Sequence, residues 1–266
     1  MLARAAHPLA PPATGWRWAA FGGLCGILIT FALFAPARWL AQALKDATHG
    51  RLVLVNPRGT VWNGSAGVVF ASGQGGAESI SLPGLLDWKL RPTWGGVTAA
   101  LELPCCAPQP LQFKALPRGD GLQLDWRDGQ SRWPAALLTG FGAPWNTLKP
   151  EGVLDIATQS FSMRWDGPQL ALAGRATLAA TDISSSLSTL KPMGSYRLTL
   201  EGGAQPTVLL ATRDGSLQLS GSGRWNGRAL RFDGEASAAP GREDALSNLL
   251  NIIGRREGAR SLITLG

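Results

Sequence analysis

Histidine supplies many of the general bases and metal ligands of enzymes, and this chain contains only two histidines. His7 lies close to the N-terminus, and His49 precedes the larger part of the sequence. A Ser-His-Asp triad or a histidine-based metal cluster therefore cannot form in the region after residue 50. The nucleophile elbow, the phosphate loop and the dinucleotide-binding pattern are also missing from the sequence.

The three cysteines have the spacing of neither a metal site nor a disulfide framework. Cys25 lies within an apolar segment, whereas Cys105 and Cys106 are adjacent. A bond between neighbouring cysteines is strained and closes no loop, so we expect no stabilising disulfide.

Acidic residues are the remaining candidates for acid and base chemistry. Glu102, Asp125 and Asp155 have the chemistry of a glycosidase pair, but any sheet protein carries comparable carboxylates. The glycine-rich stretch Ser72–Gly76 is not followed by Gly-Lys-Ser, which favours a mobile turn over a phosphate loop. We therefore expect no enzymatic reaction, no cofactor, no metal ion and no small-molecule substrate.

Tryptophan is unusually frequent, with eleven residues against one tyrosine. A glycan-binding or glycan-processing sheet is one alternative, because sugars stack on exposed aromatic rings. Trp62, Trp126, Trp165 and Trp225 are, however, in phase with apolar neighbours at the expected ends of strands. This arrangement favours packing in the core or at its rim.

Positive charge is in excess, with a net charge of +7, but it is dispersed along the chain. No basic run exceeds pairs such as Arg255-Arg256, so the sequence predicts no nucleic-acid groove. Dispersed positive charge is compatible with a weaker attraction to anionic lipid head groups or to an acidic partner.

An uncharged apolar segment covers residues 19–37. Its 19 residues would span roughly 28 Å as a helix, close to the hydrocarbon thickness of a bilayer. Trp16, Trp18 and Trp39 flank the segment, as is typical of membrane interfaces. We expect a leader over residues 1–18, a transmembrane helix over residues 19–37 and a linker over residues 38–50.

Two other interpretations of this segment remain open. Ala35-Pro36-Ala37 imitates a signal-peptide cleavage site, although a proline there and the length of the apolar run favour retention. A lipoprotein anchor at Cys25 is disfavoured because bulky Leu24 precedes it. The flanking basic residues do not decide the orientation of the segment, because Arg4 and Arg17 are matched by others after it.

Residues 51–266 have the pattern of an antiparallel sheet. Apolar residues alternate with polar ones, for example at Leu122, Leu124 and Trp126. Dipeptides of Asn or Asp with Gly, which tolerate the positive φ of tight hairpins, recur along the chain and predict turns. They are Asn63-Gly64, Asp120-Gly121, Asp128-Gly129, Asp166-Gly167, Asp214-Gly215, Asn226-Gly227 and Asp233-Gly234.

The spacing of Leu246, Leu249, Leu250 and Ile253 predicts one amphipathic helix near the C-terminus, with Gly254 at its end. This helix would cover an end or a face of the sheet and protect an edge. A last strand is expected over residues 261–265, a short helix over residues 135–138, and a possible division into two half-sheets near residue 150.

Several segments together resemble type II secretion system protein N, also called general secretion pathway protein N. The similar segments, taken in order, are residues 59–66 (GTVWNGSA), 190–198 (LKPMGSYRL), 215–227 (GSLQLSGSGRWNG), 230–236 (LRFDGEA) and 249–256 (LLNIIGRR). Each is partly ordinary hairpin sequence, and the resemblance rests on their order and on the terminal Asn-Ile-Ile-Gly-Arg-Arg. It extends over residues 40–266.

This resemblance implies a component of the apparatus that exports folded proteins, without a known reaction. It implies a single-pass location in the inner membrane with the main domain in the periplasm, and partners among other secretion components and inner-membrane lipid. It also implies a mainly β fold, a curved sheet like a β-groove or half-barrel. A distant likeness to AsmA-type β-groove proteins suggests lipid binding as the alternative function.

Candidate interaction residues lie in the turns and in the C-terminal helix, since these features would present edges or apolar faces to a partner. The candidates are Trp62, Asn63, Gly64, Trp225, Leu246, Leu249, Leu250 and Ile253.

Overall fold

A computed structural model describes residues 14–71 and 79–266. Most of the predicted leader and the glycine-rich stretch Ser72–Gly76 lie outside these residues. Sixteen strands form a single sheet, in the order β1-β2-β4-β5-β6-β7-β9-β10-β11-β12-β13-β14-β16-β15, with β3 beside β2 and β8 beside β9. Neighbouring strands pair antiparallel, and the sheet is open, with β1 at one end and β15 at the other. The prediction of a mainly β chain with a large antiparallel sheet is confirmed.

The first eight strands are β1 (Leu52–Gly59), β2 (Asn63–Ala71), β3 (Ser79–Ser81), β4 (Leu86–Thr93), β5 (Gly96–Glu102), β6 (Leu111–Arg118), β7 (Gly121–Trp126) and β8 (Gly129–Pro134). The remaining strands are β9 (Glu151–Asp166), β10 (Gln169–Ser184), β11 (Gly194–Glu201), β12 (Thr207–Gly215), β13 (Leu217–Trp225), β14 (Leu230–Ala238), β15 (Arg255–Glu257) and β16 (Arg260–Leu265). The helices are α1 (Thr14–Leu33), α2 (Ala37–Ala47), the 3-10 helix η1 (Ala135–Phe141), α3 (Trp145–Leu148) and α4 (Glu243–Ile253).

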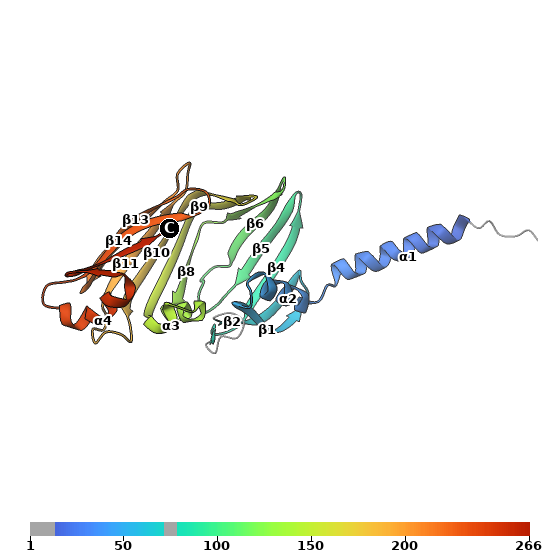
Figure 1. Ribbon diagram of the computed structural model, residues 1–266. Coiled ribbons are helices and arrows are strands. Elements are labelled where there is room, and N and C mark those ends of the chain that lie inside the picture. Colours follow the sequence, from blue (N-terminus) through green and yellow to red (C-terminus); the bar gives the residue numbers. More distant parts are fainter. Residues whose placement is uncertain (1–13, 72–78) are drawn as a thin grey trace, which may run out of the picture.

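The sheet curves, so that β4–β6 and β9–β14 form two sides of it (Figure 1). Helices α2, α3 and α4 lie along the same end of the strands, at the bottom of this view, and α1 projects away from the sheet (Figure 1). The predicted short helix over residues 135–138 is present as η1, and the predicted C-terminal helix and last strand are present as α4 and β16.

The expected membrane helix over residues 19–37 is not supported. Among the helices formed by residues 14–71 and 79–266, none is long and apolar enough to span a membrane. The helical run instead breaks at Pro36, which separates α1 from α2 and forms a β-bridge with Thr60. Ala35 and Ala37 are buried, and the carbonyl oxygen of Ala35 accepts a 2.8 Å hydrogen bond from the Val61 amide. The end of the predicted segment therefore belongs to the folded domain.

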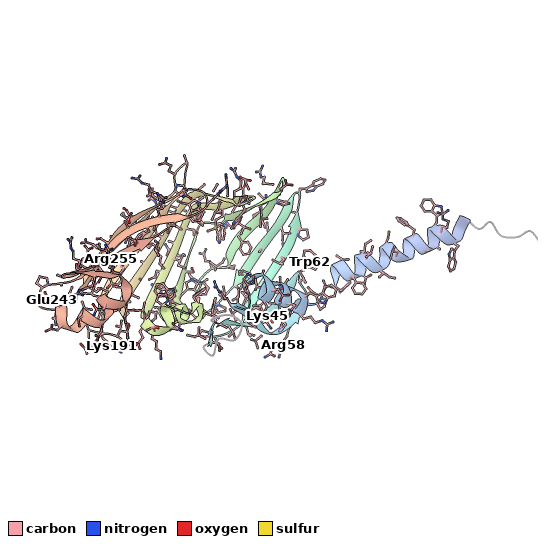
Figure 2. The ribbon with its side chains drawn as sticks, viewed as in Figure 1. Lys45, Arg58, Trp62, Lys191, Glu243 and Arg255 are labelled. Atoms are coloured by element: carbon pink, nitrogen blue, oxygen red, sulfur yellow. A yellow bond between two sulfur atoms is a disulfide. The ribbon has the colours of Figure 1, made fainter. Side chains whose placement is uncertain are left out.

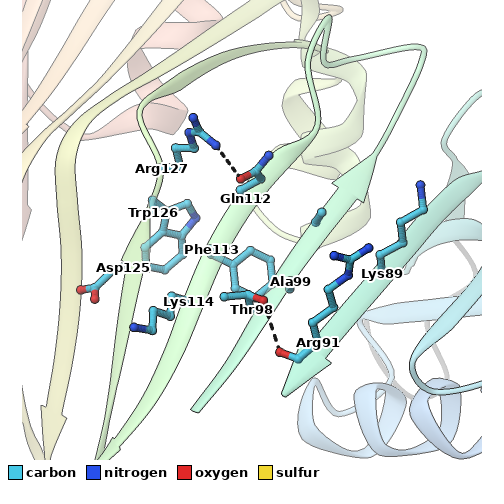
Figure 3. A pocket seen from close by; sticks show the side chains of 11 residues that line it. Lys89, Arg91, Thr98, Ala99, Gln112, Phe113, Lys114, Asp125, Trp126 and Arg127 are labelled. Atoms are coloured by element: carbon cyan, nitrogen blue, oxygen red, sulfur yellow. Dashed lines mark hydrogen bonds between the residues drawn. The ribbon is translucent and has the colours of Figure 1, made fainter. Parts of the chain in front are cut away.

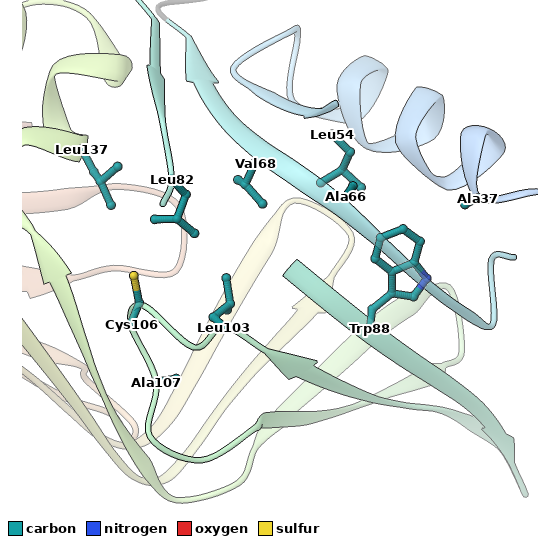
Figure 4. Close-up of a cluster of buried hydrophobic side chains, with 10 residues drawn as sticks. All are labelled: Ala37, Leu54, Ala66, Val68, Leu82, Trp88, Leu103, Cys106, Ala107 and Leu137. Atoms are coloured by element: carbon teal, nitrogen blue, oxygen red, sulfur yellow. The ribbon is translucent and has the colours of Figure 1, made fainter. Parts of the chain in front are cut away.

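Helix α2 packs against the first half of the sheet. Its residues Ala37, Leu40 and Leu44 contact a buried cluster that includes Trp88 of β4 and Leu54 of β1 (Figure 4). Part of the segment 38–50, which was expected to be a linker, is therefore a helix that packs against this cluster. Helical spacing of the apolar residues explains this packing, because it places them on one face of α2.

Helix α4 packs against the other half of the sheet. Leu246, Leu249 and Leu250 are at most 2% exposed and contact Leu217 and Ala236. Glu243 and Asp244 lie in the first turn, where negative charge complements the helix dipole. The chain leaves the helix at Gly254, as predicted.

Some of the predicted turns are correct. Trp225 pairs with Leu230 across a turn that begins at Asn226, whose Oδ1 accepts hydrogen bonds from the amides of Arg228 and Ala229. Asp166 pairs with Gln169 across a two-residue turn that contains Gly167 at φ 59°.

One predicted turn is wrong, because Asp233-Gly234 lies in the middle of β14. Asn63-Gly64 lies where the β1–β2 turn passes into β2. At Gly234 the absence of a side chain serves packing, since a Cβ would lie 2.9 Å from the ring of Phe232. Similarly, a Cβ at the paired Gly221 would meet the Phe232 ring. The glycines make room for an aromatic side chain and form no turn.

Asp128-Gly129 joins two strands that do not pair with each other. Strands β7 and β8 both pair with β9, β7 with its C-terminal half and β8 with its N-terminal half. The Asp128 carboxylate accepts a 2.5 Å hydrogen bond from the Ser160 amide of β9, which has a positive φ of 47°.

Candidate interaction surfaces

The first Trp-Asn-Gly segment forms the β1–β2 turn, and its backbone holds the indole of another tryptophan. Trp88 Nε1 donates hydrogen bonds to the carbonyl oxygens of Val61 at 3.0 Å and Thr60 at 3.2 Å. The Leu90 amide donates to the carbonyl oxygen of Trp62 at 2.7 Å. Trp62 is half-buried and Asn63 is exposed. The turn is therefore a fixed part of the domain and presents Asn63 at its surface.

Gly64 allows this close packing. A Cβ at Gly64 would lie 2.5 Å from Cζ2 of Trp88 and would also meet the Arg58 carbonyl oxygen. The observed approach of the Trp88 ring to the strand is thus possible only without a side chain.

The second Trp-Asn-Gly segment forms the β13–β14 turn. Trp225 Nε1 donates a 2.7 Å hydrogen bond to the carbonyl oxygen of Leu170, and the Leu170 amide donates to the Gly227 carbonyl oxygen at 2.9 Å. These bonds tie the turn to the start of β10, although β10 and β13 are not neighbours in the sheet. Trp225 is half-buried as a result.

The structure does not bring the predicted interaction residues together. Trp62 and Arg58 lie at one side of the sheet, and Glu243 of α4 and Arg255 lie at the other (Figure 2). Within α4, Leu246, Leu249 and Leu250 are buried, and Ile253 is half-buried against the same cluster. The exposed apolar residue of this helix is Ile252, at 48%.

One face of the sheet carries a continuous row of apolar side chains, which individual segments of sequence do not reveal. In β4–β7 the row pairs Leu90 with Ala99, Ala99 with Phe113, and Phe113 with Trp126. Trp126 packs against Phe161 of β9 with ring centroids 5.6 Å apart. Because side chains alternate along a strand, all of these residues lie on the face that α2 covers.

A second apolar row lies on the same face in the second half of the sheet. Leu178 pairs with Leu198, and Leu198 pairs with Leu210. Beside them, Ile156 pairs with Leu178 and is 37% exposed, while Leu122 of β7 is 41% exposed. The face that carries both rows is therefore largely apolar, and part of it is open to solvent at Ile156 and Leu122.

The two ends of the sheet differ in how well they exclude another strand. Strand β1 has an irregularity between Val55 and Arg58 and contains Pro57, features that discourage strand addition. Strand β15 has only three residues, all of them exposed, and it pairs with residues 260–262 of β16. The outer side of residues 263–265 has no pairing strand in the described chain.

A loop between β5 and β6 closes a gap beside β8. Cys105 and Cys106 are joined by a disulfide between chain neighbours, which closes no loop between distant parts of the chain. Cys106 is 3% exposed, and its carbonyl oxygen accepts a 2.6 Å hydrogen bond from the Arg132 amide of β8. The loop thereby takes the place of a paired strand. The proline-rich sequence did not suggest this role because the partner backbone lies far along the chain.

Tyr196 is the one group with a strongly perturbed pKa among the described residues. Burial raises the pKa of its phenol well above the usual range, and the nearby Asp214 carboxylate raises it further. Its hydroxyl donates a 3.2 Å hydrogen bond to the Leu217 carbonyl oxygen. Tyr196 is therefore a neutral structural group at physiological pH.

No group of three or more His, Cys, Asp or Glu side chains suited to a metal ion occurs within residues 14–71 and 79–266. The acidic residues considered for catalysis have other partners there. Glu102 pairs with Lys89 at 2.9 Å, Asp155 pairs with Arg132 at 2.7 Å, and Asp125 accepts a 2.7 Å hydrogen bond from Gln123.

Comparison with known proteins gives one match. A family model described as type II secretion system (T2SS), protein N, matches residues 50–263. These residues include the whole sheet apart from the last two residues of β16. No curated protein and no solved structure matches the chain significantly.

Proposed function

Since the chain belongs to the type II secretion system protein N family, we propose that it is a structural component held at the inner membrane, with its sheet in the periplasm. Its task is to bind other components of the apparatus during export of folded proteins. The observation that carries the proposal is the match over residues 50–263, which coincides with the sheet and not with an isolated motif.

The open sheet supports an interaction role. Its β15–β16 end presents unpaired backbone groups, and part of its apolar face is open to solvent. Main-chain pairing at an edge gives affinity, and pockets for alternate side chains give specificity. A tagged full-length chain, purified from detergent-solubilised membranes, should retain other secretion subunits. A chain with Thr264→Pro, which places a residue that opposes strand pairing beside the unpaired side of residues 263–265, should retain fewer; equal retention contradicts use of this edge.

Attachment to the inner membrane is proposed for α1. Supporting features are the uncharged run over residues 19–37 and the exposed side chains of Phe21, Leu24 and Ile27, each more than half exposed. After alkaline carbonate extraction, the full chain should remain with the membranes, and a chain that starts at residue 35 should be released. Release of both would contradict attachment and would also be expected after cleavage near Ala37.

The periplasmic placement has its own test. Trp94 is fully exposed at the β4–β5 turn, so Trp94→Cys supplies an accessible thiol. In a Cys25→Ser background, a membrane-impermeant maleimide should label this chain in cells with a permeabilised outer membrane. Labelling only after the inner membrane is disrupted would contradict a periplasmic sheet.

Lipid binding by the apolar face is the second candidate function. The observation that favours it is the uncovered section of the apolar row, with Ile156 and Leu122 exposed. Phospholipid should then co-purify with the chain, and Ile156→Lys should reduce the amount recovered. Equal lipid recovery from the wild type and from this variant would remove the candidate.

A further inference from the structure

A hollow of about 530 Å³ lies over β5 (Figure 3). Most of its lining residues are polar-face positions of β4–β7, and Ala99, Phe113 and Trp126 from the alternate positions also line it. Thr98 and Ala100 form its floor, because they alternate with the buried Ala99, whose side chain belongs to the apolar face. Small side chains on this central strand lie between long ones on the strands to either side. Lys89 and Arg91 lie to one side in Figure 3, and Lys114 and Arg127 lie to the other.

Cross-strand pairing places these cations in two rows. In the first row, Arg91 of β4 pairs with Thr98, and Thr98 pairs with Lys114 of β6. Neither Arg91 nor Lys114 forms an ion pair with any described residue. Asp125, the cross-strand neighbour of Lys114, also lines the hollow and accepts a hydrogen bond from Gln123, a neutral side chain that does not cancel the carboxylate charge. The first row therefore carries one cation on each side of the hollow, Arg91 and Lys114, and Asp125 partly offsets the positive charge beside Lys114.

The second row lies two residues along the strands. Lys89 pairs with Ala100, and Ala100 pairs with Gln112. Arg127 Nη1 donates a 2.9 Å hydrogen bond to Oε1 of Gln112, which holds a second cation at the far side. Lys89 is already paired with Glu102, at the end of β5. Among the residues that the structure describes, Arg127 of this row has no ion-pair partner, and Lys89 is compensated by Glu102.

The spacing of the rows fits an extended peptide better than a single anion. Residues two apart on a strand are about 6.6 Å apart, and so are side chains on one face of an extended segment. Strands β4 and β6 are separated by about 10 Å, which leaves room for one chain over β5 between the flanking cations. One phosphate group would reach a single row, whereas carboxylates at positions i and i+2 would reach both.

We propose that this hollow binds an extended acidic segment of a partner protein, with carboxylates at alternate positions between the two rows. The partner is another protein of the secretion apparatus, and in that respect alone the inference rests on the proposed function. Complementary charge at such a surface steers association and fixes the register of the bound segment.

Binding is measured by fluorescence anisotropy with the full chain in detergent and a labelled synthetic peptide in which Glu alternates with Ser. The double variant Arg91→Gln, Lys114→Gln should bind about tenfold more weakly, because two charge contacts are lost. The double variant Arg197→Gln, Arg231→Gln is the control, since it removes equal charge from exposed positions of β11 and β14. An isomeric peptide with its Glu residues in one block should bind more weakly than the alternating one.

Equal binding by the wild type and the Arg91, Lys114 variant overturns the inference. An equal loss of binding in the control variant also overturns it, because net charge alone would then explain the binding. Co-sedimentation with vesicles containing phosphatidylglycerol tests the other occupant. If the Arg91, Lys114 variant loses vesicle binding and keeps peptide binding, the hollow is a lipid surface and the inference is wrong. A normal secretion phenotype in cells lacking the protein would refute the proposed function while leaving the peptide result intact.

Discussion

Trp88 is the residue around which the first half of the sheet packs. Its side chain is 1% exposed, and its indole N–H is bonded to the backbone of the β1–β2 turn. Sequence patterns singled out Trp62, in the turn, whereas the fully buried tryptophan is Trp88, one strand further along. The sequence feature that indicates the burial of Trp88 is alternation: the apolar residues Trp88 and Leu90 lie on one face of β4, and the basic residues Lys89 and Arg91 lie on the other.

Gly64 should be intolerant of a side chain for this reason. Gly64→Ala is expected to lower the free energy of unfolding by about 1–3 kcal/mol, because the new methyl group would meet the Trp88 ring and the Arg58 carbonyl oxygen. The control is Gly67→Ala on the same strand, where a Cβ would have its nearest neighbour at an ordinary 3.7 Å. Urea unfolding followed by tryptophan fluorescence measures both. Equal stability of the two variants would contradict the packing account.

Tyr196 predicts how stability changes at high pH. Its pKa is raised in the folded protein, so the phenol keeps its proton when the unfolded chain loses it above about pH 10. Its contribution is therefore complete below pH 10 and is lost as the pH rises towards the folded pKa. The difference in unfolding free energy between the wild type and Tyr196→Phe should shrink or reverse above that pH. Tyr196 is the single tyrosine, so phenolate absorbance reports its titration directly; titration near its usual pKa would contradict burial.

At the scale of the element, α4 stabilises the fold through its buried face. Leu246→Ala should lower the free energy of unfolding by about 2–5 kcal/mol, since Leu246 is 0% exposed against Leu217 and Ala236. Ile252→Ala, on the exposed side of the same helix, should change it little. Urea unfolding again provides the measurement. A comparable loss from both substitutions would indicate a general effect on the helix instead of core packing.

Elements with a periodic apolar pattern were predictable, whereas turn dipeptides were ambiguous. The spacing of apolar residues identified α4, because a helix buries residues three and four apart. Asn226-Gly227 forms the predicted turn, yet Asp233-Gly234 lies inside β14, because Gly also serves where a ring crosses a strand. Local sequence does not distinguish these two uses of Gly, because only the folded structure shows that the Phe232 ring lies against Gly234.

At the scale of the whole molecule, the two faces of the sheet have opposite character. The apolar face is covered by α2 at one side and α4 at the other, and the polar face carries the cationic hollow over β5. Sequence alternation predicted two-faced strands but not their alignment, because the register of each strand depends on its neighbour. The hollow was therefore invisible in a sequence whose basic residues are dispersed.

The described residues form two buried clusters, one on each side of the predicted division of the sheet near residue 150. The first contains buried residues up to Leu137, and the second contains buried residues from Met193 onward. We propose that each half of the sheet packs around its own cluster. The long pairing of β9 with β10 belongs to the second half, and β7 and β8 join the halves through β9.

The most direct test of a role in type II secretion is the amount of an exported enzyme outside the cell. We expect cells without this chain to retain the enzyme in the periplasm, and the full chain supplied from a plasmid to restore export. The variant Leu246→Ala, if it accumulates to the wild-type level, should restore export less well. Unchanged export in cells that lack the chain, with no related protein to replace it, would contradict the account.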